Sequence, residues 1–244
     1  MHGSVVQAAD VAVRGDAAGV SIRMLFDAGS GGQGLVRHLV EVPAGSRLER
    51  EASTGGALWF VISGSGRLQT GDGVDMPLRP DRGVWVPPGA RPVAIADDTG
   101  ELRLDLVTLP GDVGDAASET GLKAGLSADV LVRDVGECAV EMTGDRRSRV
   151  LFGPGFGCSV ATQFVGEIPP GRAPDHRHPY DETVMVLAGE GVVHIDGGAH
   201  PLSPGTCTHL PPGLPHCLEN TGATSMRVLG VFHPADSPAA KLSH

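Results

Sequence analysis

The sequence contains no long apolar run, and its N-terminus has no basic stretch followed by an apolar one. A helix that crosses a membrane needs about 20 mostly apolar residues, and no window of even about eighteen occurs here. A secretory leader needs a basic and then an apolar region, which residues 1–10 lack. We therefore expect no membrane association and a cytoplasmic location.

Basic clusters and closely spaced cysteines are also missing. The formal net charge is -10, and an acidic protein without a basic patch is a poor partner for the phosphates of nucleic acid. The four cysteines include no C-x-x-C pair, so they do not indicate a zinc knuckle. In a cytoplasmic protein such cysteines are reduced, and we expect them to be small core residues.

Glycine and proline, by contrast, are abundant, with 36 and 19 residues. They separate many short apolar runs, which is typical of short β-strands joined by turns rather than of long helices. A chain of 244 residues can form one large domain or two ordinary ones. We therefore predict an all-β protein.

Three segments of the first half recur in the second half. Their spacing falls from 126 to 124 residues along the chain, as small changes in loop length would produce. The matched pairs are Pro43–Gly45 with Pro169–Gly171, Trp59–Gly66 with Val184–Gly191, and Val86–Pro92 with Leu210–His216. A repeat of this length indicates a duplicated domain rather than a solenoid of small repeats.

The second half also carries a set of candidate metal ligands. His176 and His178 are one residue apart in an extended segment, so their side chains point the same way, because side chains on a strand alternate in direction. Glu182 follows after a short turn, and His216 comes from a later strand. Three imidazoles and one carboxylate that converge on one point form a site for a first-row metal ion.

These four residues and the turns around them resemble the paired motif of the cupin superfamily. The first family motif, G-x5-H-x-H-x3-E-x6-G, is matched by Gly171, His176, His178, Glu182 and Gly189, with one residue fewer than usual before His176. The second, G-x5-P-x-G-x2-H-x3-N, is matched in full by Gly205, Pro211, Gly213, His216 and Asn220. The resemblance implies two tandem cupin barrels (double-stranded β-helices, or jelly rolls). It also implies one metal ion, held in the second barrel by His176, His178, Glu182 and His216.

The repeat divides the chain into two barrels. We place an N-terminal barrel at residues 1–112, a linker at 113–130 and a C-terminal barrel at 131–244. Pro92 stands in the first half where the second half has His216, so we predict no metal ion in the N-terminal barrel.

The role of this first barrel stays open between two hypotheses. It is either a packing partner for the second barrel or a binding site for a small effector. In the second case Trp59 and Trp85 are candidates to line the cavity, although buried tryptophan is also common in cores.

The ligand types admit iron, manganese, nickel or zinc, and a divalent ion with four protein ligands keeps positions open for catalysis. The resemblance implies a metal-dependent enzyme that acts on a small-molecule substrate. Its three-histidine, one-glutamate set is similar to that of flavonol- and diketone-cleaving cupins, which favours a dioxygenase. The alternatives are a non-redox isomerase, decarboxylase or lyase, an aminohydrolase of the ureidoglycine type, and a non-catalytic module that binds a metal ion or small molecule.

Other polar residues near the motifs are candidates for catalytic and binding roles. Gln163 lies on the strand before the first motif, Tyr180 lies within that motif, and His194 lies on the following strand. His194 can act as a general acid or base, because an unperturbed histidine titrates near neutrality. Arg149 and Arg172 are candidates for holding an anionic substrate. The resemblance also implies a homodimer in which edge strands pair.

Overall fold

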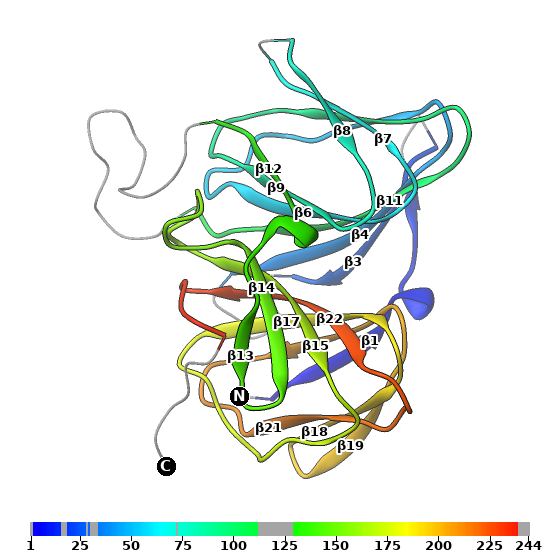
Figure 1. Ribbon diagram of the computed structural model, residues 1–244. Coiled ribbons are helices and arrows are strands. Elements are labelled where there is room, and N and C mark those ends of the chain that lie inside the picture. The colour runs from blue at the N-terminus through cyan, green and yellow to red at the C-terminus, as the bar shows by residue number, and fades with distance from the viewer. Residues whose placement is uncertain are drawn as a thin grey trace.

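The computed structural model describes residues 2–15, 19–27, 29, 34–71, 73–111 and 129–238. Within these ranges the regular secondary structure is strand, apart from two short 3₁₀ helices, η1 (Ala8–Asp10) and η2 (Val135–Glu137). None of the helical segments in these ranges is long and apolar enough to cross a membrane. The strands form two barrels, which lie one above the other in Figure 1. The prediction of an all-β protein with two tandem barrels is therefore confirmed.

Each barrel consists of a seven-stranded and a four-stranded antiparallel sheet. In the N-terminal barrel the larger sheet has the spatial order β12 (Leu131–Asp134), β9 (Arg82–Val86), β6 (Ala57–Ser63), β11 (Leu102–Thr108), β4 (Val36–Val42), β3 (Ser21–Phe26), β2 (Arg14–Gly15). Its smaller sheet has the order β5 (Arg47–Glu49), β10 (Val93–Ala96), β7 (Gly66–Gln69), β8 (Asp75–Leu78).

The C-terminal barrel has the same plan. Its larger sheet has the order β1 (Ser4–Gln7), β20 (Thr206–Leu210), β17 (Asp181–Ala188), β22 (Met226–His233), β15 (Thr162–Ile168), β14 (Arg146–Phe152), β13 (Glu141–Thr143). Its smaller sheet has the order β16 (Gly171–Arg172), β21 (His216–Asn220), β18 (Gly191–Ile195), β19 (Gly198–Leu202). The matched sequence segments thus fall on matched strands, β6 with β17 and β9 with β20.

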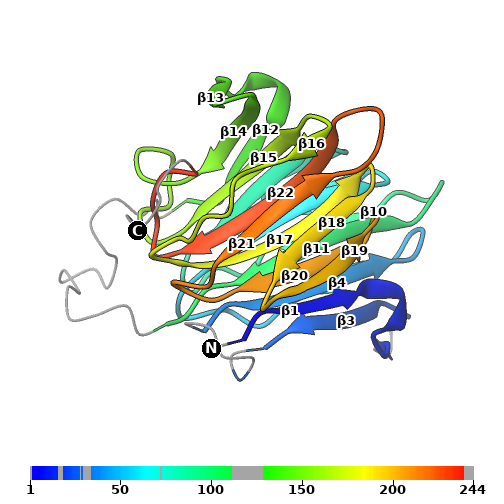
Figure 2. The same ribbon diagram turned by 90° about the horizontal axis from the view of Figure 1, so that it is seen from below.

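The two barrels exchange one outer strand each. β1 pairs with β20 of the C-terminal barrel, with Ser4 opposite His209, and Figure 2 shows the two strands side by side. In return, β12 pairs with β9 of the N-terminal barrel, with Leu131 opposite Trp85. Each exchange covers a strand edge whose backbone groups would otherwise lack partners. The predicted ranges 1–112 and 131–244 therefore each contain one strand that belongs to the sheet of the other barrel. Almost all of the predicted linker, residues 113–130, lies outside the described residues.

Strand alternation gives the large sheets two apolar faces. Trp59 of β6 points into the N-terminal barrel, whereas its neighbours Leu58 and Phe60 point toward the other barrel. There they pack in one buried cluster with Leu151 and Val165 of the C-terminal barrel. The large sheets therefore pack face to face, so both sides of each sheet are buried.

A buried ion pair also joins the two barrels. Arg37 of β4 donates from Nε to Asp105 Oδ1 of β11 at 2.7 Å, and neither side chain has exposed surface. The same guanidinium donates across the interface to Thr183 Oγ1 at 3.0 Å and to the Leu229 carbonyl at 3.3 Å. Thr183 precedes Val184 on β17, so this contact reaches the strand that begins at the candidate metal site.

Candidate metal centre

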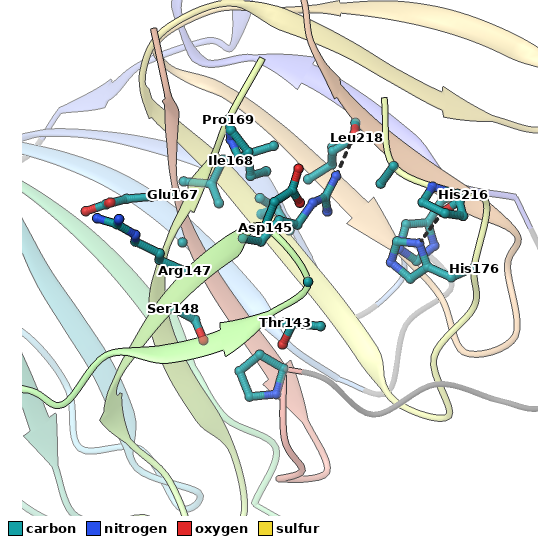
Figure 3. Close-up of a pocket in the computed structure, with 18 of the residues that line it drawn as sticks. Thr143, Asp145, Arg147, Ser148, Glu167, Ile168, Pro169, His176, His216 and Leu218 are labelled. Atoms are coloured by element: carbon teal, nitrogen blue, oxygen red, sulfur yellow. Dashed lines mark hydrogen bonds between the residues drawn. The ribbon is translucent and has the colours of Figure 1, made fainter. Parts of the chain in front are cut away.

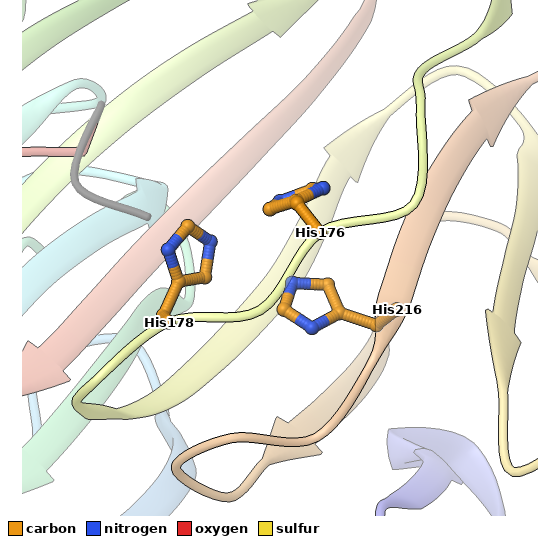
Figure 4. A group of neighbouring side chains, drawn as sticks. All are labelled: His176, His178 and His216. Carbon is orange, nitrogen blue, oxygen red and sulfur yellow. The ribbon is translucent and has the colours of Figure 1, made fainter. Parts of the chain in front are cut away.

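Three of the four predicted ligands converge inside the C-terminal barrel (Figure 4). The ligand atoms of His176, His178 and His216 all lie within 4.8 Å of one another. Backbone hydrogen bonds set this geometry: the His176 amide donates to the His216 carbonyl at 3.0 Å, and the reverse bond is 2.9 Å. The Gly213 amide donates to the His178 carbonyl at 2.8 Å. The loop that carries the first two histidines is thus paired with the turn and strand that carry the third.

Backbone carbonyls hold two of the imidazoles in a ligand-ready orientation. Nδ1 of His176 lies 3.1 Å from the Pro174 carbonyl, and Nδ1 of His216 lies 2.9 Å from the Leu214 carbonyl. A carbonyl oxygen can only accept a hydrogen bond, so each Nδ1 carries the proton and each Nε2 is the unprotonated nitrogen of its ring. This is the arrangement found when protein imidazoles ligate a metal ion through Nε2.

Glu182, the fourth predicted ligand, lies at the start of β17 beside the histidines. Its Oε2 is 3.7 Å from His178 Nε2 and 3.9 Å from His216 Nε2. Burial raises the pKa of Glu182 to about 7, and the neighbouring Asp181 carboxylate contributes to the rise. Burial also lowers the pKa of His216 to about 3, with a further contribution from His176.

These shifts describe a site that disfavours both an unpaired carboxylate and an unpaired imidazolium. A divalent cation among the four side chains would stabilise the carboxylate and would accept the Nε2 lone pairs. The donor set is therefore chemically suited to a first-row ion, although the assignment of these four residues as ligands stays a prediction.

A cavity of about 500 Å³ opens from the histidines. Figure 3 shows the β13–β14 hairpin, with Thr143 and Asp145, on one side of the cavity and His176 and His216 on the other. Its apolar wall is formed by side chains of the barrel interior: Phe164, Ile168, Val184, Leu210, Leu218 and Val228. The cavity therefore combines a polar base with apolar walls, as small-molecule sites commonly do.

Arg146 is a cavity residue that the sequence interpretation missed. It follows a two-residue hairpin turn, in which Gly144 adopts a φ of 64°, and it pairs across that turn with Thr143. Its Nη2 donates to the Leu218 carbonyl at 2.9 Å, and the guanidinium makes no ion pair with any described residue. Burial lowers the pKa of Arg146, while Asp145 and Glu182 act in the opposite direction. The hairpin thus brings a half-buried cation to the wall of the cavity.

Comparison with known proteins agrees with the motif pattern and the fold. Residues 164–232 match the family model described as "Cupin domain". A solved structure of a Pseudomonas aeruginosa protein named for induction by glyoxylate superposes with a TM-score of 0.77 and 14% identity, covering 94% of this chain and 88% of that one. The match of residues 164–232 identifies a cupin domain within the C-terminal barrel. Oxalate decarboxylase of Bacillus subtilis, which has Mn(II) centres, superposes on this chain with a TM-score of 0.71 and 14% identity over 98% and 78% of the two chains.

A curated relative covers only part of this chain. Protein SchB of Streptomyces halstedii is 37% identical over 91 residues, which are 36% of this chain and 64% of SchB. The chain thus spans less than two thirds of the length of the curated relative that it matches. The solved structures cover more of the chain, but at 14% identity they show the fold alone.

None of the three predicted catalytic residues lines the cavity. His194 lies on the outer face of the small sheet, where its Nε2 is 2.7 Å from Glu219 Oε2. Gln163 is fully buried against the N-terminal barrel, where its Nε2 donates to the Trp59 carbonyl at 3.4 Å. Both differences follow from strand alternation, because the adjacent residues of the same strands point inward.

Tyr180 is the candidate that lies nearest the metal ligands, but it contacts them through its ring. The ring stacks between His178, at a centroid distance of 4.7 Å, and Phe232, at 4.1 Å. Its hydroxyl donates to the Ser237 carbonyl at 3.3 Å, and burial raises its pKa above the usual value. Tyr180 therefore positions His178 rather than facing the cavity.

Of the two predicted anion-binding arginines, Arg172 lines the cavity and Arg149 does not. Arg172 is half exposed and pairs with Asp175 at 3.2 Å. Arg149 donates to the Cys138 carbonyl at 2.7 Å. All four cysteines are buried and free of disulfides, as expected.

Proposed function

We propose that the C-terminal barrel of this cupin binds one divalent first-row metal ion through His176, His178, Glu182 and His216. We further propose that the protein is a metal-dependent enzyme for a small organic anion. The observation that supports this proposal is that three imidazoles converge beside the buried Glu182 carboxylate at the edge of a cavity. Two of them, His176 and His216, have Nδ1 hydrogen-bonded to a backbone carbonyl. A purely structural ion would not need a cavity of about 500 Å³ beside it.

The substrate class is inferred from Arg146. Its guanidinium uses one N–H on the Leu218 carbonyl and has no carboxylate in ion-pair contact among the described residues. The remaining N–H groups can donate to an anionic ligand, and partial burial strengthens such charge-assisted bonds. The apolar walls would contact the rest of the ligand, so the fitting substrate is a small organic acid or enolate with an apolar part.

Each group of the chain has a distinct task in this proposal. The bound ion, when present, would supply Lewis acidity to a substrate oxygen and, if it is iron, redox chemistry. Arg146 orients the substrate anion, and the apolar walls exclude water from it. The carbonyls of Pro174 and Leu214 keep the protons of His176 and His216 on Nδ1.

A dioxygenase is the reaction class that we propose first, because the three-histidine, one-glutamate set resembles that of oxygen-dependent cupins. A non-redox reaction such as decarboxylation is the second candidate. The observation that favours it is the half-buried Arg146, together with the fold shared with an Mn(II)-containing decarboxylase. An aminohydrolase, an isomerase or lyase, a non-catalytic binding module and the homodimer remain predictions.

The first test is metal content per chain after purification without a metal-affinity step. We expect about one iron, manganese, nickel or zinc per wild-type chain, and loss of that metal in His176→Ala and His216→Ala. His194→Ala is the matched control, because His194 lies on the outer face of the barrel, and it should retain the metal. Full occupancy in His216→Ala would refute the ligand assignment.

The second test distinguishes the reaction classes. Protein loaded with iron should consume oxygen in the presence of an enolic substrate if it is a dioxygenase. Turnover without oxygen consumption would assign a non-redox reaction. Arg146→Gln should raise the KM for an anionic substrate while the metal content stays unchanged; an unchanged KM would refute the role of Arg146.

A further inference from the structure

The N-terminal barrel also contains a cavity, of about 340 Å³. Trp59, Val86 and Pro92 line it, and their repeat partners Val184, Leu210 and His216 line the cavity of the C-terminal barrel. The two cavities are thus equivalent by the internal repeat. The first barrel therefore has a cavity at the equivalent place, although Pro92 stands where the second barrel has His216.

Arg50 supplies a charged group to this N-terminal cavity. Arg50 comes directly after β5, two residues beyond Leu48, whose side chain lies in the barrel core. Side chains two residues apart in an extended segment point to the same face, so Arg50 also faces the barrel interior. Arg50 lies 126 residues before His176, which is within the spacing of the internal repeat, so it is equivalent in position to a candidate ligand of the other barrel. The Arg50 side chain is only partly exposed, and this burial lowers the pKa of its guanidinium. Across the described residues it has no ion pair or hydrogen bond, although buried cations usually have a partner.

Among the described residues, no carboxylate makes an ion pair with Arg50. Glu51 also borders the cavity, but its side chain is exposed and pairs with Arg91 at 3.3 Å. His38 lies on the same face of β4 as the cavity-lining Val36. Burial lowers the pKa of His38 to about 4, and the positive charges of Arg50 and Arg14 contribute to the decrease. His38 is therefore neutral near pH 7, and its Nδ1 has no hydrogen-bond partner among the described residues. Within the part of the chain that the structure describes, the positive charge of Arg50 at this cavity thus has no ion-pair partner.

The remaining walls indicate the shape of a ligand. Ser53, Thr54 and Thr108 add polar side chains around the opening, while Trp59 and Leu106 add apolar surface deeper in the barrel. An anion would satisfy Arg50, and an apolar body would cover the indole of Trp59. A cation would be repelled, and a neutral ligand would leave the guanidinium unpaired.

We propose that the N-terminal barrel is a second ligand site, which binds a small organic carboxylate through Arg50 with the apolar part of the ligand on Trp59. The site needs no metal ion and does not depend on the function proposed for the other barrel. It also answers the question left open by the sequence in favour of a binding role for this barrel. Trp85, the other candidate, instead packs in the cluster between the barrels.

Tryptophan fluorescence can test this site separately from the metal centre. Both tryptophans of the chain lie in the N-terminal half, so Trp85→Phe leaves Trp59 as a reporter inside the proposed cavity. The full-length Trp85→Phe protein would be titrated with benzoate, and with benzyl alcohol and benzylamine as neutral and cationic controls. We expect a saturable change with benzoate and at least tenfold weaker responses to the two controls.

Arg50→Gln, made in the same background, should weaken benzoate binding by roughly 10- to 100-fold, which corresponds to the loss of charge-assisted hydrogen bonds. Arg91→Gln is the matched control, because Arg91 lies near the same opening but already pairs with Glu51, and its affinity should stay unchanged. Arg50→Lys should give an intermediate affinity, and it serves as the test if Arg50→Gln does not fold. Equal affinity in the Trp85→Phe protein and in both Arg50 variants made from it, or no saturable response to benzoate at millimolar concentrations, would overturn the proposal.

Discussion

The ion pair buried between the barrels allows a quantitative test of how the two halves are coupled. Arg37→Met removes the guanidinium while keeping a long apolar side chain, so little volume is lost. The Asp105 carboxylate then stays buried without its partner at 2.7 Å, and its other oxygen already has none. Removal of one member of a buried pair costs about 3–5 kcal/mol of the free energy of unfolding, and we expect a value in that range.

The double variant Arg37→Met/Asp105→Leu separates charge from packing. It buries no charge and leaves only Thr183 and the Leu229 carbonyl without their cross-interface donor, at about 1 kcal/mol each. It should therefore be more stable than the single variant by about 1–3 kcal/mol, since both partners of the pair are gone.

Urea unfolding followed by circular dichroism at pH 7 measures these differences, provided that the slopes of the transitions agree. Arg47→Met, which disrupts an exposed pair with Glu49 at 3.0 Å, is the control and should cost at most about 1 kcal/mol. The reasoning is refuted if Arg37→Met costs no more than this control, or if the double variant is less stable than the single one.

Two further predictions concern the metal centre. With a chelator present, Glu182→Gln should be more stable than wild type by at most about 3 kcal/mol at pH 8 and equally stable near pH 4.5. The reason is that Glu182 has a pKa of about 7 in the folded state, so wild type loses stability as the pH rises from 4.5 through 7. A difference in melting temperature between the two proteins that does not grow with pH would contradict this. Tyr180→Phe should keep the metal affinity of wild type, since the ring still stacks on His178, whereas Tyr180→Leu should weaken that affinity by about tenfold. Competition with a metal indicator measures both affinities. Equal affinities of the two variants would show that the stacking does not support metal binding by His178.

The fold and the converging histidines could be predicted because they depend on local patterns. Glycines and prolines mark the turns, and the spacing of His176 and His178 puts both imidazoles on one side of an extended segment. The matched segments of the two halves also fall on equivalent strands, so the duplication could be read without a structure.

The rest of the site depends on register and on what covers each sheet, which local patterns do not encode. His194 is in register with Cys217, on the face opposite to His216, and this pairing is visible only once β18 and β21 are aligned. Gln163 has its polar group in an interface between barrels, which the sequence of one strand cannot reveal. Arg146 reaches the cavity because a hairpin folds over the barrel, although its short Gly-Asp turn was a usable signal.

The exchange of β1 and β12 has a consequence for the order in which the protein is assembled. As the ribosome releases the chain from its N-terminus, Ser4–Gln7 emerge about 200 residues ahead of Thr206–Leu210, the strand with which they pair. The N-terminal barrel in turn waits for Leu131–Asp134 to complete its own sheet. Neither sheet is complete when the first 112 residues have been made, so a chain truncated there leaves open sheet edges in its N-terminal barrel and an unpaired β1. The N-terminal sheet can be completed once Leu131–Asp134 has emerged, whereas β1 stays without its partner until Thr206–Leu210 follows.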